Sequence, residues 1–476
     1  MNITTTQSSP VRLPFKHALG LILAGAVAFQ AAYTFAPCSF LIVIYLWCLF
    51  QLALLGSSRQ AFYSGLMIGV LAYAPQSTFL WTIFGPAAIP LWFVLSFWIG
   101  VFLLLARLCL THLGKLPALL LIPCLWTGLE YFRSELYYLR FSWFNAGFVF
   151  SGNLQWLPFR LLGVYGIGFL LMAIISLSTL LKRKQKIVAS AALLALLGLL
   201  TNAPIKTGAS SSRPGRSFQA AGVQLEFPSE TQVIVSLNEL IKTYPQAKLL
   251  LLSEYTVDGP VPPQIQLWCK KNQRYLIVGA KVPASAAQYF DTGFVIDPAG
   301  EIVFRQGKSV PIQFFKDGLP AREQKLWDSP WGKIGICICY DLSYSRVTDR
   351  LVRLGAQAII VPTMDLVDWG RHQHELHARV APIRSAEYGV PIFRLASSGI
   401  SQCVDKMGIV SATAPVPGDG AMIAGTVVLE RPGTLPLDRV IAPASCVLTG
   451  LFIAWLTLRP VLKGRRPQVA TSSTYT

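Results

Sequence analysis

Long apolar runs constrain this chain most, because each is long enough to cross a lipid bilayer as a helix. A helical crossing takes roughly 20 residues, and seven such runs fall within residues 1–206. They begin near Ala18, Cys38, Ala61, Pro90, Leu116, Leu157 and Ile187, and an eighth extends from Val440 to Leu458. A content of 53% hydrophobic and 13% charged residues agrees with a membrane protein.

Basic residues between the runs predict which way the spans face. Lys and Arg gather in cytoplasmic loops, and here they fall in alternate loops if the N-terminus is cytoplasmic. These inward segments hold Arg59, Arg107 with Lys115, Lys182, Arg183, Lys184 and Lys186, and finally Arg459, Lys463, Arg465 and Arg466. The first run is followed directly by further spans, so we expect it to stay uncleaved. The segment between the seventh and eighth spans then lies outside the cytoplasm.

Charge and cysteine content argue against two other classes of protein. The formal net charge is +18, but the basic residues are spread out and many flank apolar runs, so we expect no nucleic-acid binding. The nine cysteines lack paired CxxC spacing. Four of them, at 38, 48, 109 and 124, lie inside apolar runs as small hydrophobic residues. A disulfide framework is therefore not implied.

Residues 207–440 differ in character and predict a water-facing α/β domain. Strands are expected at QAAGVQLEF, KLLLLSEY, RYLIVGAKV, TGFVIDP, EIVFRQGK, GKIGICICY, AQAIIVPT and PIFRLAS. Helical patterns lie between them at 231–243, 345–354 and 373–388. The expected order is a transmembrane domain over 1–206 with seven spans, an extracytoplasmic domain over 207–440, an eighth transmembrane helix over 441–458 and a cytoplasmic tail over 459–476.

Cys339 ends the strand GKIGICICY and is a candidate nucleophile. Alternation along the strand puts Cys337 and Cys339 on one face. A helix beginning just after Asp341 would aim its first amides at the Cys339 sulfur and favour the thiolate. A buried free cysteine with a packing role is the equally simple alternative.

Glu254 and Lys308 also stand where predicted strands end. Glu254 closes KLLLLSEY and Lys308 closes EIVFRQGK. Each alone could be a surface charge, but open α/β sheets collect their active sites at the carboxyl ends of strands. Together with Cys339 they would supply a base, a cation and a nucleophile.

With these residues in place, the sequence resembles a known family. The order Glu254, Lys308, Cys339 is similar to the triad of the nitrilase (carbon-nitrogen hydrolase) superfamily, and the spans narrow the likeness to bacterial apolipoprotein N-acyltransferases. It is carried by SEYTV, DTGFVIDPAGEIVFRQGKSVP, ICYDLSY, RSAEYGVPIFRLASSGIS, TFAPCSF and FSWFNAGFVFSGN. The resemblance implies an αββα sandwich inserted between spans seven and eight of about eight transmembrane helices. It also implies the bacterial inner membrane, with the catalytic domain on the periplasmic side.

The resemblance further implies a two-step acyl transfer without metal or organic cofactor. Cys339 would attack a phospholipid ester, Glu254 would move the proton, and Lys308 would stabilise the oxyanion with a backbone amide near Tyr340. The resulting thioester would acylate the N-terminal diacylglyceryl-cysteine of an apolipoprotein. Asp341 follows as a supporting residue, where the family commonly has glutamate.

The chain departs from the family after the lysine. The family has a glutamate within a Val-Pro-Phe-Gly-Glu run, whereas this chain reads SVPIQFFKDG. Gln313 or Asp317 are the polar candidates to replace it, and Gln313 is also a candidate substrate-binding residue.

Two other motifs have alternative interpretations. In HQHELH, His374 and His377 could share a helix face and bind a metal, but polar residues at a helix start are the preferred interpretation. Trp143 could line a lipid-binding groove or belong to the aromatic belt at the membrane interface.

Competing functions use the same residues differently. A membrane-tethered amidase would transfer the acyl group to water. An inactive envelope scaffold would keep the fold without the chemistry. A transporter is disfavoured because the spans hold few ionisable groups at mid-membrane depth.

Overall fold

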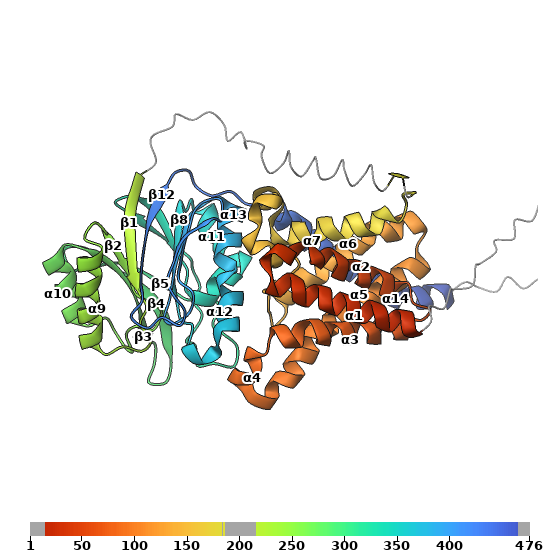
Figure 1. Ribbon diagram of the computed structural model, residues 1–476, viewed down its shortest axis with the longest axis horizontal. Helices are drawn as coiled ribbons and strands as arrows, with labels where there is room; N and C mark the ends of the chain where they lie inside the picture. Colours follow the sequence, from red (N-terminus) through yellow and green to blue (C-terminus); the bar gives the residue numbers. More distant parts are fainter. Residues whose placement is uncertain (1–14, 183, 186–215, 465–476) are drawn as a thin grey trace, which may run out of the picture.

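The computed structural model describes residues 15–182, 184–185 and 216–464, which form a helical bundle joined to an α/β sandwich (Figure 1). The bundle contains α1 (Phe15–Thr34), α2 (Ile42–Ala53), α3 (Ser58–Gln76), α4 (Phe79–Phe84), α5 (Ala88–His112), α6 (Lys115–Tyr131), α7 (Phe159–Ser178) and α14 (Asp438–Gly464). Short 3-10 turns, among them η1 (Ala36–Leu41), connect several of these helices.

Five stretches within the described residues are long and apolar enough to cross a membrane. They are 16–34, 36–53, 79–112, 159–178 and 438–460. The spans expected near Ala61 and Leu116 form α3 and α6 and pack within the same bundle (Figure 1). The span expected from Ile187 lies outside the described residues.

Two six-stranded sheets form the sandwich, and each mixes parallel and antiparallel pairs. The first has the order β12-β1-β2-β3-β4-β5, with β1 (Arg216–Val223), β2 (Leu249–Leu251), β3 (Tyr275–Pro283), β4 (Tyr289–Ile296), β5 (Ile302–Gly307) and β12 (Met422–Leu429). The second has the order β11-β10-β9-β8-β7-β6, with β6 (Leu326–Ser329), β7 (Gly332–Ile336), β8 (Ala358–Thr363), β9 (Ile392–Ala396), β10 (Gln402–Val404) and β11 (Val410–Thr413).

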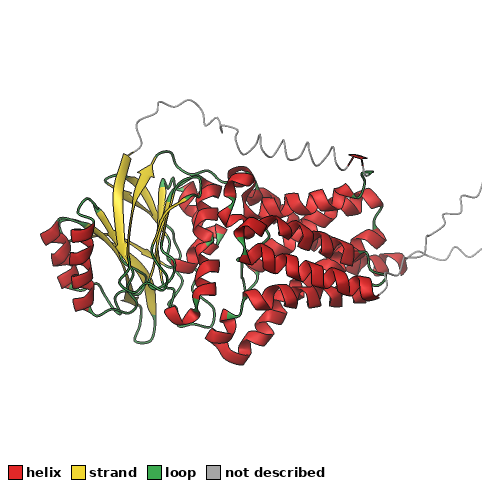
Figure 2. Cartoon of the chain, in the orientation of Figure 1, coloured by secondary structure: helices red, strands yellow, loops and turns green. Residues whose placement is uncertain are grey.

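The sheets face each other across an apolar core, and helices cover their outer faces. Leu251 and Ile277 of the first sheet share this core with Ile336 and Ile360 of the second. On one side α9 (Glu230–Thr243) and α10 (Pro263–Asn272) cover the first sheet. On the other, α11 (Ser345–Arg353), α12 (Arg371–Ala378) and α13 (Val380–Tyr388) lie between the second sheet and the bundle (Figures 1 and 2). This arrangement agrees with the expected layered α/β domain.

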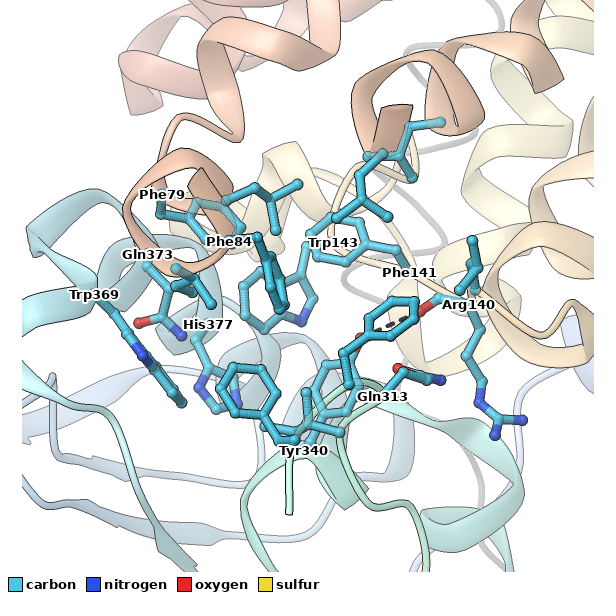
Figure 3. Close-up of a pocket in the computed structure, with 18 of the residues that line it drawn as sticks. Phe79, Phe84, Arg140, Phe141, Trp143, Gln313, Tyr340, Trp369, Gln373 and His377 are labelled. Carbon is cyan, nitrogen blue, oxygen red and sulfur yellow. Dashed lines mark hydrogen bonds between the residues drawn. The ribbon is translucent and has the colours of Figure 1, made fainter. Parts of the chain in front are cut away.

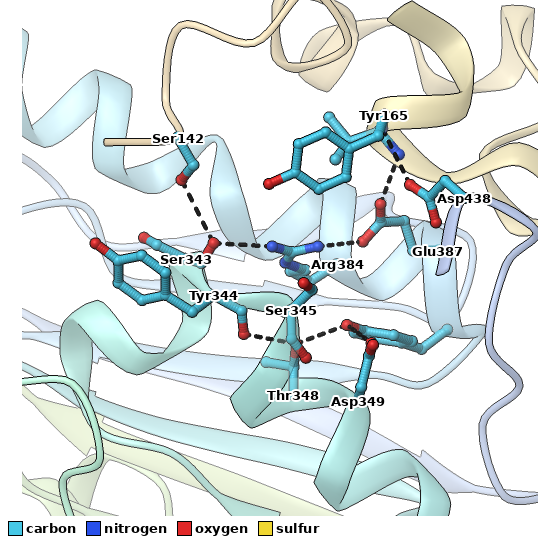
Figure 4. Close-up of polar contacts among 12 residues, drawn as sticks. Ser142, Tyr165, Ser343, Tyr344, Ser345, Thr348, Asp349, Arg384, Glu387 and Asp438 are labelled. Carbon is cyan, nitrogen blue, oxygen red and sulfur yellow. Dashed lines mark hydrogen bonds and ion pairs between the residues drawn. The ribbon is translucent and has the colours of Figure 1, made fainter. Parts of the chain in front are cut away.

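Buried hydrogen bonds from the bundle fix the chain segment that follows Cys339. The Glu135 carboxylate accepts from the backbone N–H of Ser345 at 3.0 Å and from its hydroxyl at 2.8 Å, which caps α11. The Trp143 indole N–H donates to the Ser343 hydroxyl at 3.0 Å. Arg384 of α13 donates to the Ser343 carbonyl at 2.8 Å (Figure 4). The helical bundle and the α/β sandwich therefore share one polar junction.

A second set of contacts joins the same junction to α7 and α14. Arg384 pairs with Glu387 at 2.7 Å, and Glu387 accepts from the Val164 backbone N–H at 2.6 Å (Figure 4). The Asp438 carboxylate lies so close to Gly163 that a Cβ there would be 2.2 Å from it. Gly163 also has φ +69°, a conformation that glycine adopts without steric cost. The glycine thus allows α14 to begin against α7.

Candidate functional site

Cys339 lies at the tip of a tight turn between β7 and α11. Its φ of +50° is uncommon for a residue with a side chain and marks a constrained position. The turn continues as the 3-10 segment η6 (Cys339–Ser343), so α11 begins only at Ser345. The expected helix N-terminus directly behind the sulfur is therefore not formed. Instead the Sγ atom lies 3.6 Å from the Met364 carbonyl oxygen at the end of β8.

Asp341 ties the cysteine turn to the lysine segment. Its carboxylate accepts from the backbone N–H groups of Ser309 at 3.0 Å and Val310 at 2.7 Å. It also accepts from Ile338 N–H, one residue before Cys339, at 3.3 Å. Burial raises the pKa of Asp341 to about 6, against the opposing effect of these hydrogen bonds. Asp341 thus holds the turn that carries Cys339 against the segment that follows Lys308.

Glu254 and Lys308 meet in a buried ion pair. The Lys308 Nζ atom lies 2.7 Å from Glu254 Oε1, and both side chains are only 1% exposed. The second oxygen, Oε2, accepts from the Met364 backbone N–H at 2.7 Å. Gly279 of β3 permits this packing, because a Cβ there would lie 2.6 Å from the Glu254 Cα. The carboxylate is therefore held from two sides.

Two further carboxyl groups surround the same ammonium. Asp317 Oδ2 lies 2.7 Å from Lys308 Nζ, and Asp291 Oδ2 lies 3.7 Å from it. Asp317 also accepts from the Tyr255 hydroxyl at 2.8 Å. Of the two polar candidates in the segment after the lysine, it is thus Asp317 that contacts the lysine. The carboxyl oxygens of Glu254, Asp291 and Asp317 lie within 4.8 Å of one another, and the ammonium supplies their cation.

Burial and the ion pair set opposite charge states for the two acids nearest the lysine. Burial would raise the pKa of Glu254, but the Lys308 charge and hydrogen bonds from Asp291, Lys308 and Cys339 lower it overall. Burial and the Glu254 charge raise the pKa of Asp291 well above its usual range. Asp291 is then a neutral acid beside an ionised Glu254.

Cys339 rests as a thiol. Burial and the negative charge of Glu254 raise the pKa of its thiol well above the usual value, and Lys308 opposes them only in part. The expectation of a resting thiolate is therefore wrong, because the sulfur is buried beside a carboxylate. A reaction at this sulfur needs the proton removed, and the Glu254 carboxylate, whose charge acts directly on the thiol, is placed to take it.

An apolar cavity of about 120 Å³ extends from Cys339 toward the bundle (Figure 3). Helices α4 and α5 form one wall, the 139–143 segment forms another, and residues 312–315 close it. Its lining comprises Phe79, Leu80, Ile83, Phe84, Leu91, Val94, Leu95, Leu139, Arg140, Phe141, Trp143, Ile312, Gln313, Phe314, Phe315, Cys339, Tyr340, Trp369, Gln373 and His377. Side chains from the bundle and from the α/β domain thus build one chamber.

The remaining candidates from the sequence also border this cavity. Tyr340 lines it, and its hydroxyl donates to the Arg140 carbonyl at 3.3 Å. Trp143 is buried and lines it, and its role in lipid binding stays a prediction. Gln313 lines it as well, and its amide donates to the Tyr138 carbonyl at 3.1 Å.

The histidines of HQHELH do not converge on a common point. One ring nitrogen of His372 lies 3.0 Å from the Gln76 carbonyl, and one of His374 lies 2.8 Å from the Leu366 carbonyl. His377 Nδ1 instead lies 2.8 Å from the Asp365 carboxylate. Their separate partners favour structural roles for the first two.

Sequence reasoning missed Asp291 and Asp365. Asp291 stands two residues into β4, and Asp365 follows β8 at the sheet edge that also carries Cys339. The second position was open to the same strand-end argument that found Glu254. The first was not, because nothing in the local pattern distinguishes a buried aspartate from an exposed one.

Comparison with known proteins adds two family matches. Residues 226–431 match the carbon-nitrogen hydrolase family, and residues 20–177 match the apolipoprotein N-acyltransferase N-terminal domain. An apolipoprotein N-acyltransferase of Geobacter metallireducens is 24% identical over 345 residues, which cover 63% of this chain and 66% of that protein. A formamidase of Bacillus cereus is 27% identical over 183 residues, covering 31% of this chain and 54% of the formamidase.

Among solved structures, yeast Nit3 (Saccharomyces cerevisiae), a member of the nitrilase superfamily, aligns at 21% identity with a TM-score of 0.39. The alignment covers 46% of this chain and 93% of Nit3.

Proposed function

Because this chain is an apolipoprotein N-acyltransferase-like protein, we propose that it N-acylates the terminal diacylglyceryl-cysteine of apolipoproteins, with a phospholipid as acyl donor. The reaction would complete lipoprotein maturation. Support comes from the pairing of the two matched domains in one chain and from the cavity they share. Both substrates are lipids or lipid-anchored, and an enzyme with several membrane-crossing helices meets them in the bilayer.

The site would face the outer leaflet of the bacterial inner membrane. We propose that the chain crosses the membrane eight times, with residues 207–440 inserted between the seventh and the eighth spans on the periplasmic side. Alternation of basic loops supports this orientation. The position of α14 (Asp438–Gly464) after the α/β domain and inside the bundle agrees with it.

In the first step, Cys339 would take the acyl chain. Glu254 accepts the thiol proton as the sulfur attacks the sn-1 ester carbonyl of the phospholipid, forming a C–S bond. Lys308, with the backbone N–H of Tyr340, stabilises the tetrahedral oxyanion. The C–O bond then breaks, Glu254 returns the proton to the leaving alkoxide, and a lysophospholipid departs. An acyl thioester remains on Cys339.

In the second step, the acceptor amine would attack the thioester carbonyl. A C–N bond forms, the C–S bond breaks and the electron pair returns to the sulfur. The products are an amide and the free Cys339 thiol, so the enzyme follows ping-pong kinetics and consumes no cofactor. The apolar lining of the cavity keeps water from the thioester in the interval between the two steps.

The observation that carries this proposal over hydrolysis is the apolar cavity between Cys339 and the membrane helices α4 and α5. A formamidase acts on one of the smallest amides, which has no need for such a chamber. The membrane-tethered amidase nevertheless remains the alternative, because part of the chain is similar to formamidases. An inactive envelope scaffold is the other alternative.

Incubation of the purified protein in detergent micelles with labelled phospholipid and a diacylglyceryl-cysteine peptide decides among them. We expect a triacylated peptide and one equivalent of lysophospholipid. An amidase would release free ammonia from formamide and leave the peptide unmodified, and a scaffold would do neither. The Cys339→Ala variant is the control, and it should yield no acylated peptide.

A further inference from the structure

His377, the last histidine of HQHELH, borders the same cavity as the reactive sulfur. It lies on α12 and lines the chamber (Figure 3). Cys339 is part of the same lining. Its ring stacks on the Trp143 indole, with centroids 5.0 Å apart and planes inclined by 21°. The residue is 2% exposed. It is thus a buried, titratable group at the site that neither acyl-transfer step above uses.

Asp365 fixes the tautomer of this histidine. The Asp365 carboxylate lies 2.8 Å from His377 Nδ1 and 2.5 Å from Arg394 Nη2. Burial would raise the pKa of Asp365, but His377 and Arg394 hold it below its usual range, so the group is an ionised acceptor. Arg394 Nη2 also lies 3.0 Å from Nδ1, but it donates to the second Asp365 oxygen. Because an ionised carboxylate oxygen only accepts, the 2.8 Å contact with Asp365 requires the proton on Nδ1 and leaves the lone pair of the ring on Nε2.

Nε2 is buried and has no hydrogen-bond partner among the residues that the structure describes. A buried polar atom left unpaired costs free energy unless a ligand pairs it. Burial lowers the pKa of His377, and Arg394 supports this, whereas Asp365 and Glu254 oppose it. The ring is therefore neutral at pH 7 and is able to accept a proton.

Resting on the proposed function, we propose that His377 is the general base for the second step, in which it deprotonates the acceptor amine. The α-ammonium of the acceptor transfers one proton to His377 Nε2 and becomes a neutral amine. That nitrogen attacks the Cys339 thioester, its second proton passes to Glu254 and then to the sulfur, and the C–S bond breaks. His377 returns its proton to water after the product leaves. Atoms and charges balance without another reactant.

The two steps call for different bases because the first removes a proton from the Cys339 thiol and the second removes one from the α-ammonium group of the acceptor. An α-amino group has a pKa near 7.7–8.0, so much of the acceptor arrives protonated and cannot attack. Glu254 is a weak base for this task, since Lys308 lowers its pKa. A neutral imidazole is closer to the amine in basicity and gains typically 10²–10⁴-fold in such a transfer. Asp365 would position the ring, as its contact with Nδ1 shows.

The experiment measures the two half-reactions separately in the His377→Gln variant of the full chain in micelles. We expect thioester formation on Cys339 within about twofold of wild type and transfer to the diacylglyceryl-cysteine peptide slowed by about 10²–10⁴-fold. Hydroxylamine, whose nitrogen is already unprotonated at neutral pH, should discharge the variant thioester at the wild-type rate. If His377 had only a structural role, the variant thioester would react more slowly with hydroxylamine as well as with the peptide.

Two further variants keep the test decisive. His377→Met fills the ring's volume without a base and should repeat the result if the glutamine variant folds poorly. His374→Gln, on the same helix but outside the cavity lining, should leave both half-reactions unchanged. Equal transfer rates in wild type and both His377 variants would overturn the inference. Failure of the wild-type protein to form any thioester would instead overturn the proposed function.

Discussion

Asp291 gives the sharpest test of the charge arrangement at the site. Burial and the Glu254 charge raise the pKa of Asp291 well above its usual range, so the folded protein keeps this proton while the unfolded chain loses it near pH 4. Between the pKa of Asp291 in the unfolded chain and its pKa in the folded protein, each rise of one pH unit lowers the free energy of unfolding by about 1.4 kcal/mol. If Asp291 stays protonated to pH 7, the wild type loses about 2.7 kcal/mol between pH 5 and pH 7 from this residue alone.

The Asp291→Asn variant has no such proton to lose. Its amide stays neutral at every pH, so its unfolding free energy relative to wild type should rise by about 2.7 kcal/mol from pH 5 to pH 7. Chemical unfolding of both proteins in micelles at pH 5, 6 and 7 measures this difference. Asp328→Asn, at an exposed position of β6, is the control and should show a constant difference. If the difference in unfolding free energy between Asp291→Asn and wild type is also constant with pH, Asp291 is not a neutral acid in the folded protein.

Three other substitutions test the ion pair, the junction and the cavity. Lys308→Met leaves buried carboxylates unpaired, so it should lower the unfolding free energy by about 3–5 kcal/mol and abolish thioester formation. Lys325 is largely exposed, so the control Lys325→Met should change the unfolding free energy and thioester formation little. Glu135→Ala should lower unfolding free energy by about 2–4 kcal/mol, because it removes a helix cap and leaves buried donors unpaired, and Glu135→Gln should lose less than half of that. Leu91→Trp narrows the cavity, so transfer of long acyl chains should fall about tenfold more than that of short ones in a donor-competition assay.

Much of the fold followed from residue patterns. Eight predicted strands correspond to β1–β5 and β7–β9, because alternating or continuous apolar runs bounded by turn residues mark buried strands. The strands β6, β10, β11 and β12 were missed. The first three hold only three or four residues, which carry too little periodicity, whereas β12 (Met422–Leu429) has eight. The helix predicted over 373–388 is divided in the structure: α12 ends at Ala378, four residues before Pro382, whose ring clashes with the carbonyl at that position.

The site was predictable to the extent that it sits at strand ends. Glu254 and Lys308 each follow a strand, and the structure brings them into contact at 2.7 Å. Their catalytic roles stay a prediction. Asp365 follows β8 and was open to the same argument. Asp291 and His377 depend instead on which face of a strand or helix turns inward, and packing between sheets and bundle decides that. Sequence spacing does not contain this information.

Mass spectrometry of Cys339 tests the central claim most directly. The wild-type protein, incubated with phospholipid alone, should carry one acyl chain on the Cys339 peptide, and hydroxylamine should remove it. Addition of the diacylglyceryl-cysteine peptide should return the free thiol and transfer the same mass to the peptide's amine. An unmodified Cys339 under these conditions, with acylated peptide still produced, would contradict the account.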